Sequence, residues 1–107
     1  MERKRAVIYV RGETAIEQKL FCYFYAAEND IEVLFTTNDF DEVMSCEDCN
    51  MVLTVNASRI SRDALIYHKV IKDLNAKGIE VVHTATGKNT ERFLDFVTRD
   101  VRMKKKK

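Results

Sequence analysis

The chain has 107 residues, of which 46% are hydrophobic and 33% are charged, a balance that excludes a disordered chain and fits one small globular domain. No apolar run approaches the roughly 20 residues that a bilayer-spanning helix needs, which argues against a membrane partner. The net charge of +1 excludes a polycation, and no apolar signal region with a small-residue cleavage site follows the basic residues at 3–5, so we expect a cytoplasmic protein without a secretory signal.

Short apolar segments alternate with segments of helical periodicity. The first predicted strand covers 5–11, and the helix after it begins at Thr14, where Glu17 completes a capping box. This helix is expected to end near Asn29 and to face the core with residues spaced four, four and three apart, namely Ile16, Leu20, Phe24 and Ala27. A second strand is predicted at 31–36.

The second half of the chain repeats this alternation. A short helix capped by Asn38 or Asp39 and ending near residue 45 precedes a strand at 50–55. A loop at 56–63 enters a helix that Gly78 ends in the left-handed conformation. A fourth strand at 79–85, a turn at 87–89 and a last helix at 90–101 complete the pattern.

This order predicts an α/β fold with a single domain over 1–107. Strands that are apolar throughout and separated by helices favour a small doubly wound three-layer sandwich around a mostly parallel four-stranded sheet. The basic end at 101–107 is expected to be a flexible tail. Ligands of such folds bind beyond the carboxyl ends of the strands, so the loops after the first, third and fourth strands should meet at one edge.

Three arginines belong to these loops. Arg11, Arg59 and Arg62 would suit a phosphodiester, because each guanidinium can bind phosphate oxygens with two hydrogen bonds. The alternative is that each arginine forms an ion pair with a local acid such as Glu13 or Asp63.

The cysteines and histidines do not predict a metal site. Cys46 and Cys49 form a CxxC pair, but no second pair follows, and the other soft ligands Cys22, His68 and His83 are scattered. The pair lies at a helix end beside two acids, which would raise the thiol pKa and disfavour redox chemistry. We therefore expect no metal and no cofactor.

Two stretches together resemble the serine recombinases, the resolvases and invertases. One is YVR at 9–11 followed by the helix and turn IEQKLFCYFYAAENDIEV at 16–33, and the other is the strand, loop and helix at 52–82, whose RISRD at 59–63 is the specific part. The resemblance covers about residues 5–83. It implies a resolvase-like fold and a role in DNA recombination.

The resemblance also implies site residues, position by position. Tyr9 and Arg11 match the family's tyrosine and arginine at the strand end, Gln18 matches a helix glutamine, and Arg59 and Arg62 match the paired arginines that hold the scissile phosphate. The serine nucleophile, however, aligns with Glu13. The segment 35–44 lacks another arginine run of the family, and no DNA-binding domain follows.

Cleavage by this family requires a hydroxyl that attacks phosphorus, so no catalytic residue is expected to be active here. We expect a non-catalytic regulator or partner in recombination of a mobile element. One alternative is a phosphodiester-acting enzyme that uses Glu13, and another is an interaction module unrelated to DNA, which would self-associate through the apolar residues of the last helix, Phe93, Phe96 and Val97. Weak electrostatic DNA binding would use Lys104, Lys105, Lys106 and Lys107.

Overall fold

The computed structural model describes residues 4–85. Its elements alternate in the predicted order. They are β1 (Arg5–Tyr9), α1 (Ala15–Glu28), β2 (Glu32–Thr37), α2 (Phe40–Ser45), β3 (Met51–Thr54), the 3-10 helix η1 (Ala57–Arg59), α3 (Ala64–Ala76) and β4 (Glu80–His83). The predicted turn at 87–89, the last helix at 90–101 and the tail at 101–107 lie outside the described residues.

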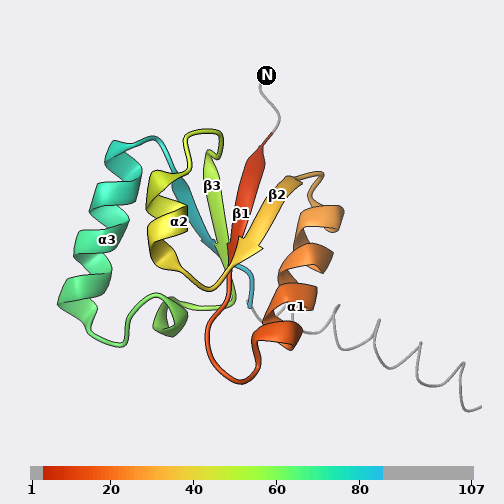
Figure 1. Cartoon of the computed structure of the whole chain (residues 1–107), viewed down its shortest axis with the longest axis horizontal. Coiled ribbons are helices and arrows are strands. Elements are labelled where there is room, and N and C mark those ends of the chain that lie inside the picture. The colour runs from red at the N-terminus through yellow and green to blue at the C-terminus, as the bar shows by residue number, and fades with distance from the viewer. Residues whose placement is uncertain (1–3, 86–107) are drawn as a thin grey trace, which may run out of the picture.

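The four strands form one parallel sheet in the order β2-β1-β3-β4. β1 lies at the centre, with Ile8 opposite Thr36 of β2 and Leu53 of β3. Because all strands point the same way, the loops that follow them share one edge, at the lower end of Figure 1. The predicted α/β fold with a mostly parallel four-stranded sheet is confirmed.

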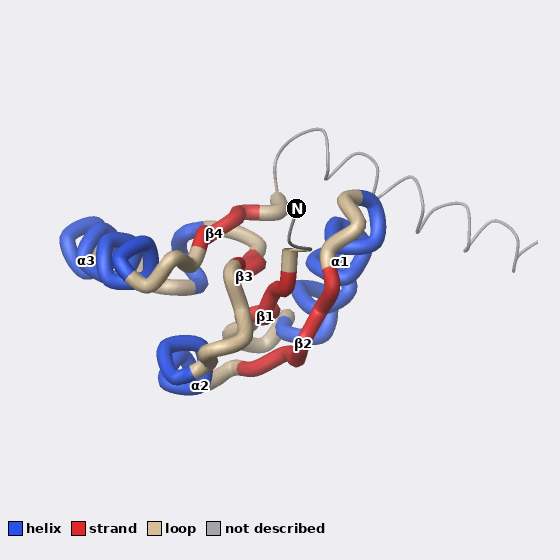
Figure 2. The backbone as a smooth tube through the Cα atoms, turned by 90° about the horizontal axis from the view of Figure 1, so that it is seen from above, coloured by secondary structure: helices blue, strands red, loops and turns tan. Residues whose placement is uncertain are grey.

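Helices cover both faces of this sheet, which gives the predicted three layers. Figures 1 and 2 show α1 on one face and α2 with α3 on the other. Side chains of β1 alternate between two buried clusters, with Ile8 and Val10 on the α1 side and Val7 and Tyr9 on the side of α2 and α3. Burial on both faces explains why the strands are apolar throughout.

The predicted core face of α1 is wrong. Ile16 and Leu20 are 74% and 55% exposed, and the buried residues of the helix are instead Gln18, Phe21, Cys22 and Ala26. Gln18, at the start of this stripe, is held by hydrogen bonds to Arg11 just after β1. A polar residue on the inward face conceals the true face from a search for apolar spacing.

The helix ends follow the predicted residues, with one exception. Asp39 caps α2 through its side chain, and Gly78 has the left-handed φ of 79° that ends the segment after α3. At α1, Thr14 is the N-cap residue, but its side chain makes no capping bond to the backbone. The capping box with Glu17 is therefore wrong, because the Thr14 hydroxyl instead accepts from the side chain of Gln18.

Within residues 4–85, none of the helices is long and apolar enough to span a bilayer.

Candidate anion-binding site

The backbone at the end of β1 is held by a buried glutamine. Gln18, only 4% exposed, accepts from the Arg11 N–H at 3.0 Å and donates its Nε2 to the Arg11 carbonyl at 2.7 Å. The same nitrogen lies 2.8 Å from Thr14 Oγ1. Gln18 thus satisfies both backbone groups of Arg11 beyond the last residue of the strand, and this fixes where the Arg11 side chain begins.

The loop after β3 brings Arg59 to the same place. Arg59 ends η1, and its Nη1 donates to the Arg11 carbonyl at 3.2 Å, although the two residues are 48 positions apart. Gly12 makes this approach possible, because its φ is +94° and a Cβ added there would lie 3.4 Å from Arg59 Nη1. The hydrogen bond therefore joins the loops after β1 and β3, which Figure 1 shows together at the lower end of the sheet.

A cavity of about 500 Å³ lies between these two loops. Its lining comprises Arg11, Gly12, Ser58, Arg59, Ser61, Arg62 and Asp63, and we call it the arginine cavity. Three guanidinium groups face one carboxylate there, a net of two positive charges. The carboxylate of Asp63 is already used at the start of α3, where it accepts from the N–H groups of Leu65 at 2.9 Å and Ile66 at 3.3 Å.

The alternative in which local acids neutralise the arginines is wrong for the described part of the chain. Neither Glu13 nor Asp63 forms an ion pair with Arg11, Arg59 or Arg62 there, and Glu13 is exposed and does not line the cavity. The Nε–H of Arg59 is buried and has no hydrogen-bond partner within residues 4–85. A buried donor without a partner costs about 1–3 kcal/mol, so this guanidinium carries unused capacity for an acceptor.

Tyr9 does not belong to the arginine cavity. Its side chain is buried among the residues under α2, where its ring meets that of Phe40 edge to face with centroids 5.1 Å apart. The structure therefore brings together Arg11, Arg59 and Arg62, places Gln18 behind them as a support, and leaves Tyr9 in the core and Glu13 in solvent. Lys104, Lys105, Lys106 and Lys107 lie outside the described residues.

Sequence reasoning missed the small residues of the cavity and its neighbour. Ser58 and Ser61 line the arginine cavity and also a second, mostly apolar hollow of about 350 Å³ that reaches Tyr67. The Tyr67 hydroxyl lies 2.8 Å from His83 Nε2, and partial burial raises the pKa of this phenol. Ser61 belongs to the RISRD segment, but the pattern assigns a role only to its arginines, and only the placement of Ser58 after β3 and of His83 at the end of β4 could have indicated the other two.

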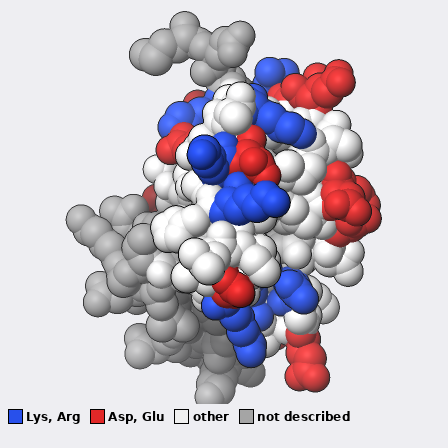
Figure 3. Space-filling view, turned by 90° about the vertical axis from the view of Figure 1, so that its left-hand side faces the viewer, with Lys and Arg blue, Asp and Glu red and all other residues white. Residues whose placement is uncertain are grey.

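The face of the molecule that carries α3 is mixed in charge. Figure 3, which faces the side of the molecule that carries α3, shows basic and acidic side chains interspersed among uncharged ones. A field of one sign does not cover this face, so attraction of an anion must come from the local arrangement of the arginines.

Burial makes the thiol of Cys22, the cysteine outside the CxxC pair, unreactive. Cys22 is fully buried under α1, where its sulfur lies 3.6 Å from Thr84 Oγ1, and burial raises its pKa to about 11. Within residues 4–85, no group of three or more His, Cys, Asp or Glu side chains could hold a metal ion.

The fold resembles that of serine recombinase catalytic domains of known structure. The chain is similar to the N-terminal catalytic domain of TP901-1 integrase, with a TM-score of 0.69 and 18% identity over 96% of this chain and 98% of that one. It is also similar to the C-terminal catalytic domain of ISC1926 TnpA, an IS607-like serine recombinase, with a TM-score of 0.66 and 17% identity over 88% of this chain and 78% of that one. No protein-family model and no curated protein matches the chain, so the likeness is one of fold.

Proposed function

We propose that this protein is a non-catalytic relative of serine recombinase catalytic domains that binds the phosphate backbone of DNA at the arginine cavity and acts as a regulator or partner in recombination of a mobile element. One observation carries the proposal: Arg11, Arg59 and Arg62 line one cavity without a paired acid in the described structure. A phosphodiester supplies the negative charge and the acceptors that these side chains lack.

The absence of catalysis follows from the position after Arg11 and Gly12. Glu13 occupies the place that the resemblance assigns to the serine, and its carboxylate repels an anionic phosphodiester instead of attacking it. Ser58 and Ser61 do line the cavity, but each hydroxyl already has a local partner, Ser58 with Asn56 Oδ1 and Ser61 with the Asp63 backbone. Within residues 4–85, neither has a basic side chain hydrogen-bonded to it that could remove its proton.

Trapping of covalent intermediates tests the non-catalytic part. The protein is incubated with supercoiled DNA, the reaction is stopped with denaturant, and adducts are sought by gel electrophoresis and mass spectrometry, with an active serine recombinase as the positive control. We expect no adduct and no change in DNA topology. A covalent link to any hydroxyl, including Ser58 or Ser61, would overturn the claim.

The rival enzyme that uses Glu13 is tested separately. A phosphodiester substrate with a chromogenic leaving group is offered with Mg²⁺ or Mn²⁺ to the wild type and to Glu13→Gln. We expect no turnover by either protein, because Glu13 is exposed and no cluster of metal ligands exists among residues 4–85. Turnover by the wild type that Glu13→Gln abolishes would establish the rival.

A further inference from the structure

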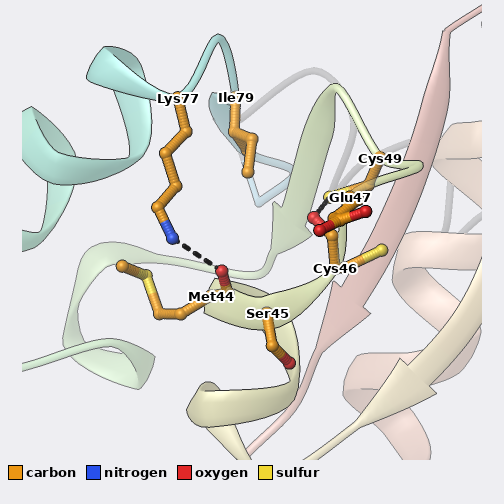
Figure 4. Close-up of a pocket in the computed structure, with 7 residues that line it drawn as sticks. All are labelled: Met44, Ser45, Cys46, Glu47, Cys49, Lys77 and Ile79. Atoms are coloured by element: carbon orange, nitrogen blue, oxygen red, sulfur yellow. Dashed lines mark hydrogen bonds between the residues drawn. The ribbon is translucent and has the colours of Figure 1, made fainter.

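A second cavity lies at the opposite edge of the sheet, before the strands begin. Its volume is about 590 Å³, and its lining consists of Met44, Ser45, Cys46, Glu47, Cys49, Lys77 and Ile79 (Figure 4). We call it the thiol cavity. The turn between α2 and β3 contributes the two cysteines, and the turn between α3 and β4 contributes Lys77 and Ile79. The proposed function uses none of these residues.

The donor atoms of this cavity are predominantly soft. Two thiols stand three positions apart in the sequence MSCEDC, and the thioether-bearing Met44 lines the same space. Cys49 is buried at 7% exposure, and Cys46 is partly exposed, which gives one anchored sulfur and one that can turn. The two residues meet across the turn, because Cys49 Sγ lies 3.9 Å from the Cys46 carbonyl and both residues line the same cavity.

A positive charge lies at the rim of the same cavity. Lys77 donates its ammonium to the Met44 carbonyl at 2.8 Å, which holds the charge at the rim of the cavity (Figure 4). Glu47 places an opposite charge in the same lining, but it is exposed and its charge is screened by water.

We propose that Cys46 and Cys49 form a two-thiolate binding site for one soft monovalent metal ion, with Cu(I) as the biological ion of this class. Thiolate and thioether ligands select such ions, and two thiolates satisfy them in linear coordination. Zn²⁺ does not fit, because it requires four ligands and the described residues offer no group of three or more suitable side chains here.

Binding requires a small rearrangement and the release of protons. In the structure Cys49 Sγ donates weakly to the Cys46 carbonyl at 3.9 Å, and Cys46 Sγ points away from Lys77 (Figure 4). Rotation about the Cα–Cβ bond of Cys46 redirects its sulfur without moving the backbone. Each thiol then gives its proton to solvent and a lone pair to the ion, and no electron is transferred. The complex carries one negative charge in a cavity whose rim holds the Lys77 ammonium.

Titration of the reduced chain with Ag(I), and with Cu(I) in competition with a chromophoric chelator, tests the site without oxygen. Stoichiometry comes from mass spectrometry under non-denaturing conditions, and the sulfur–metal bond from ultraviolet charge-transfer absorption. We expect one ion per chain in the wild type and none in Cys46→Ser. Cys22→Ser is the matched control, because it removes a thiol on the other face of the sheet, and it should still bind one ion.

Two further results decide the proposal if Cys46→Ser is ambiguous. Lys77→Gln should retain the ion with about 10-fold lower affinity, since it removes only a supporting charge. Retention of wild-type affinity by Cys46→Ser, with its fold verified by circular dichroism, would overturn the proposal. A wild-type chain with both thiols shown to be reduced that binds no ion would overturn it as well.

Discussion

At the carboxyl edge of the sheet three arginines line a cavity, whereas at the amino edge two thiols and a lysine line another. The carboxyl edge gathers its residues from positions far apart in the chain, and a backbone carbonyl and a buried glutamine hold them together. The amino edge builds its cavity from two tight turns. The arginine cavity therefore depends on hydrogen bonds between distant segments of the chain, whereas the thiol cavity depends on the close spacing of residues within two turns.

Removal of the support should have the largest effect. Gln18→Ala deletes three hydrogen bonds in a buried position and leaves the Arg11 backbone groups without these partners, so we expect a loss of about 3 kcal/mol in the free energy of unfolding. Urea denaturation measures it. Gln18→Glu should lose at least as much, because it retains the acceptor but places a buried carboxylate oxygen against the Arg11 carbonyl. A loss under about 1 kcal/mol for Gln18→Ala would contradict the network.

At alkaline pH thiols lose their proton, whereas guanidinium groups keep their charge. The pKa of Cys22 is raised to about 11 in the fold, so its thiol stays neutral there while the unfolded chain ionises from about pH 9. Its contribution to stability is complete below pH 9 and is lost as the pH rises to about 11. The stability difference between wild type and Cys22→Ala should therefore fall by up to about 1.4 kcal/mol per pH unit in this range. A difference independent of pH would contradict the burial of this thiol.

Two glycines offer a matched pair across the two edges. Gly12 and Gly78 have φ of +94° and +79°, so an alanine at either position should cost about 1–2 kcal/mol for the left-handed backbone. Only at Gly12 does the added Cβ meet Arg59 Nη1, at 3.4 Å, whereas nothing lies within 4 Å at Gly78. Gly12→Ala should thus also weaken binding of inorganic sulfate, measured by NMR titration, and Gly78→Ala should not. Equal sulfate affinity in both variants would show that Arg59 does not contribute to anion binding at the cavity.

Tyr67→Phe should have the smallest effect. It removes the 2.8 Å hydrogen bond to His83 and keeps the ring, so we expect a loss of about 1 kcal/mol in the free energy of unfolding. Sulfate affinity should stay unchanged, because Tyr67 lines only the neighbouring hollow. Thermal denaturation and the same NMR titration provide the two readouts. A marked loss of sulfate affinity would extend the anion site to this residue.

The sequence predicted the fold because strands that are buried on both faces are apolar throughout. Such short apolar segments can be recognised from the order of residues without any motif. It also predicted that Arg11, Arg59 and Arg62 share an edge, since parallel strands require it. It failed where polar atoms decide the geometry. The inward face of α1 begins with Gln18, which apolar spacing cannot detect, and Tyr9 turned inward because it occupies the buried side of β1 beside Val7. The pairing of arginines with acids depends on side-chain direction, which spacing does not encode.

The thiol cavity was overlooked for a related reason. A search for four metal ligands dismisses a single CxxC, and the contribution of Lys77 and Met44 becomes visible only when two turns are placed side by side. Sequence spacing identified the two sulfurs, but the neighbouring charge comes from a helix end 28 positions after Cys49.

Binding of a short DNA duplex tests the central claim most directly. The affinities of the wild type, Arg59→Gln and Lys72→Gln are compared over a range of salt concentrations. Lys72 is exposed on α3 and does not line the cavity, so Lys72→Gln removes the same charge as Arg59→Gln but outside the cavity. We predict that Arg59→Gln weakens binding and lowers the salt slope by about 1, while Lys72→Gln stays near wild type. Equal affinities and slopes for the two variants would contradict a phosphate site at the arginine cavity.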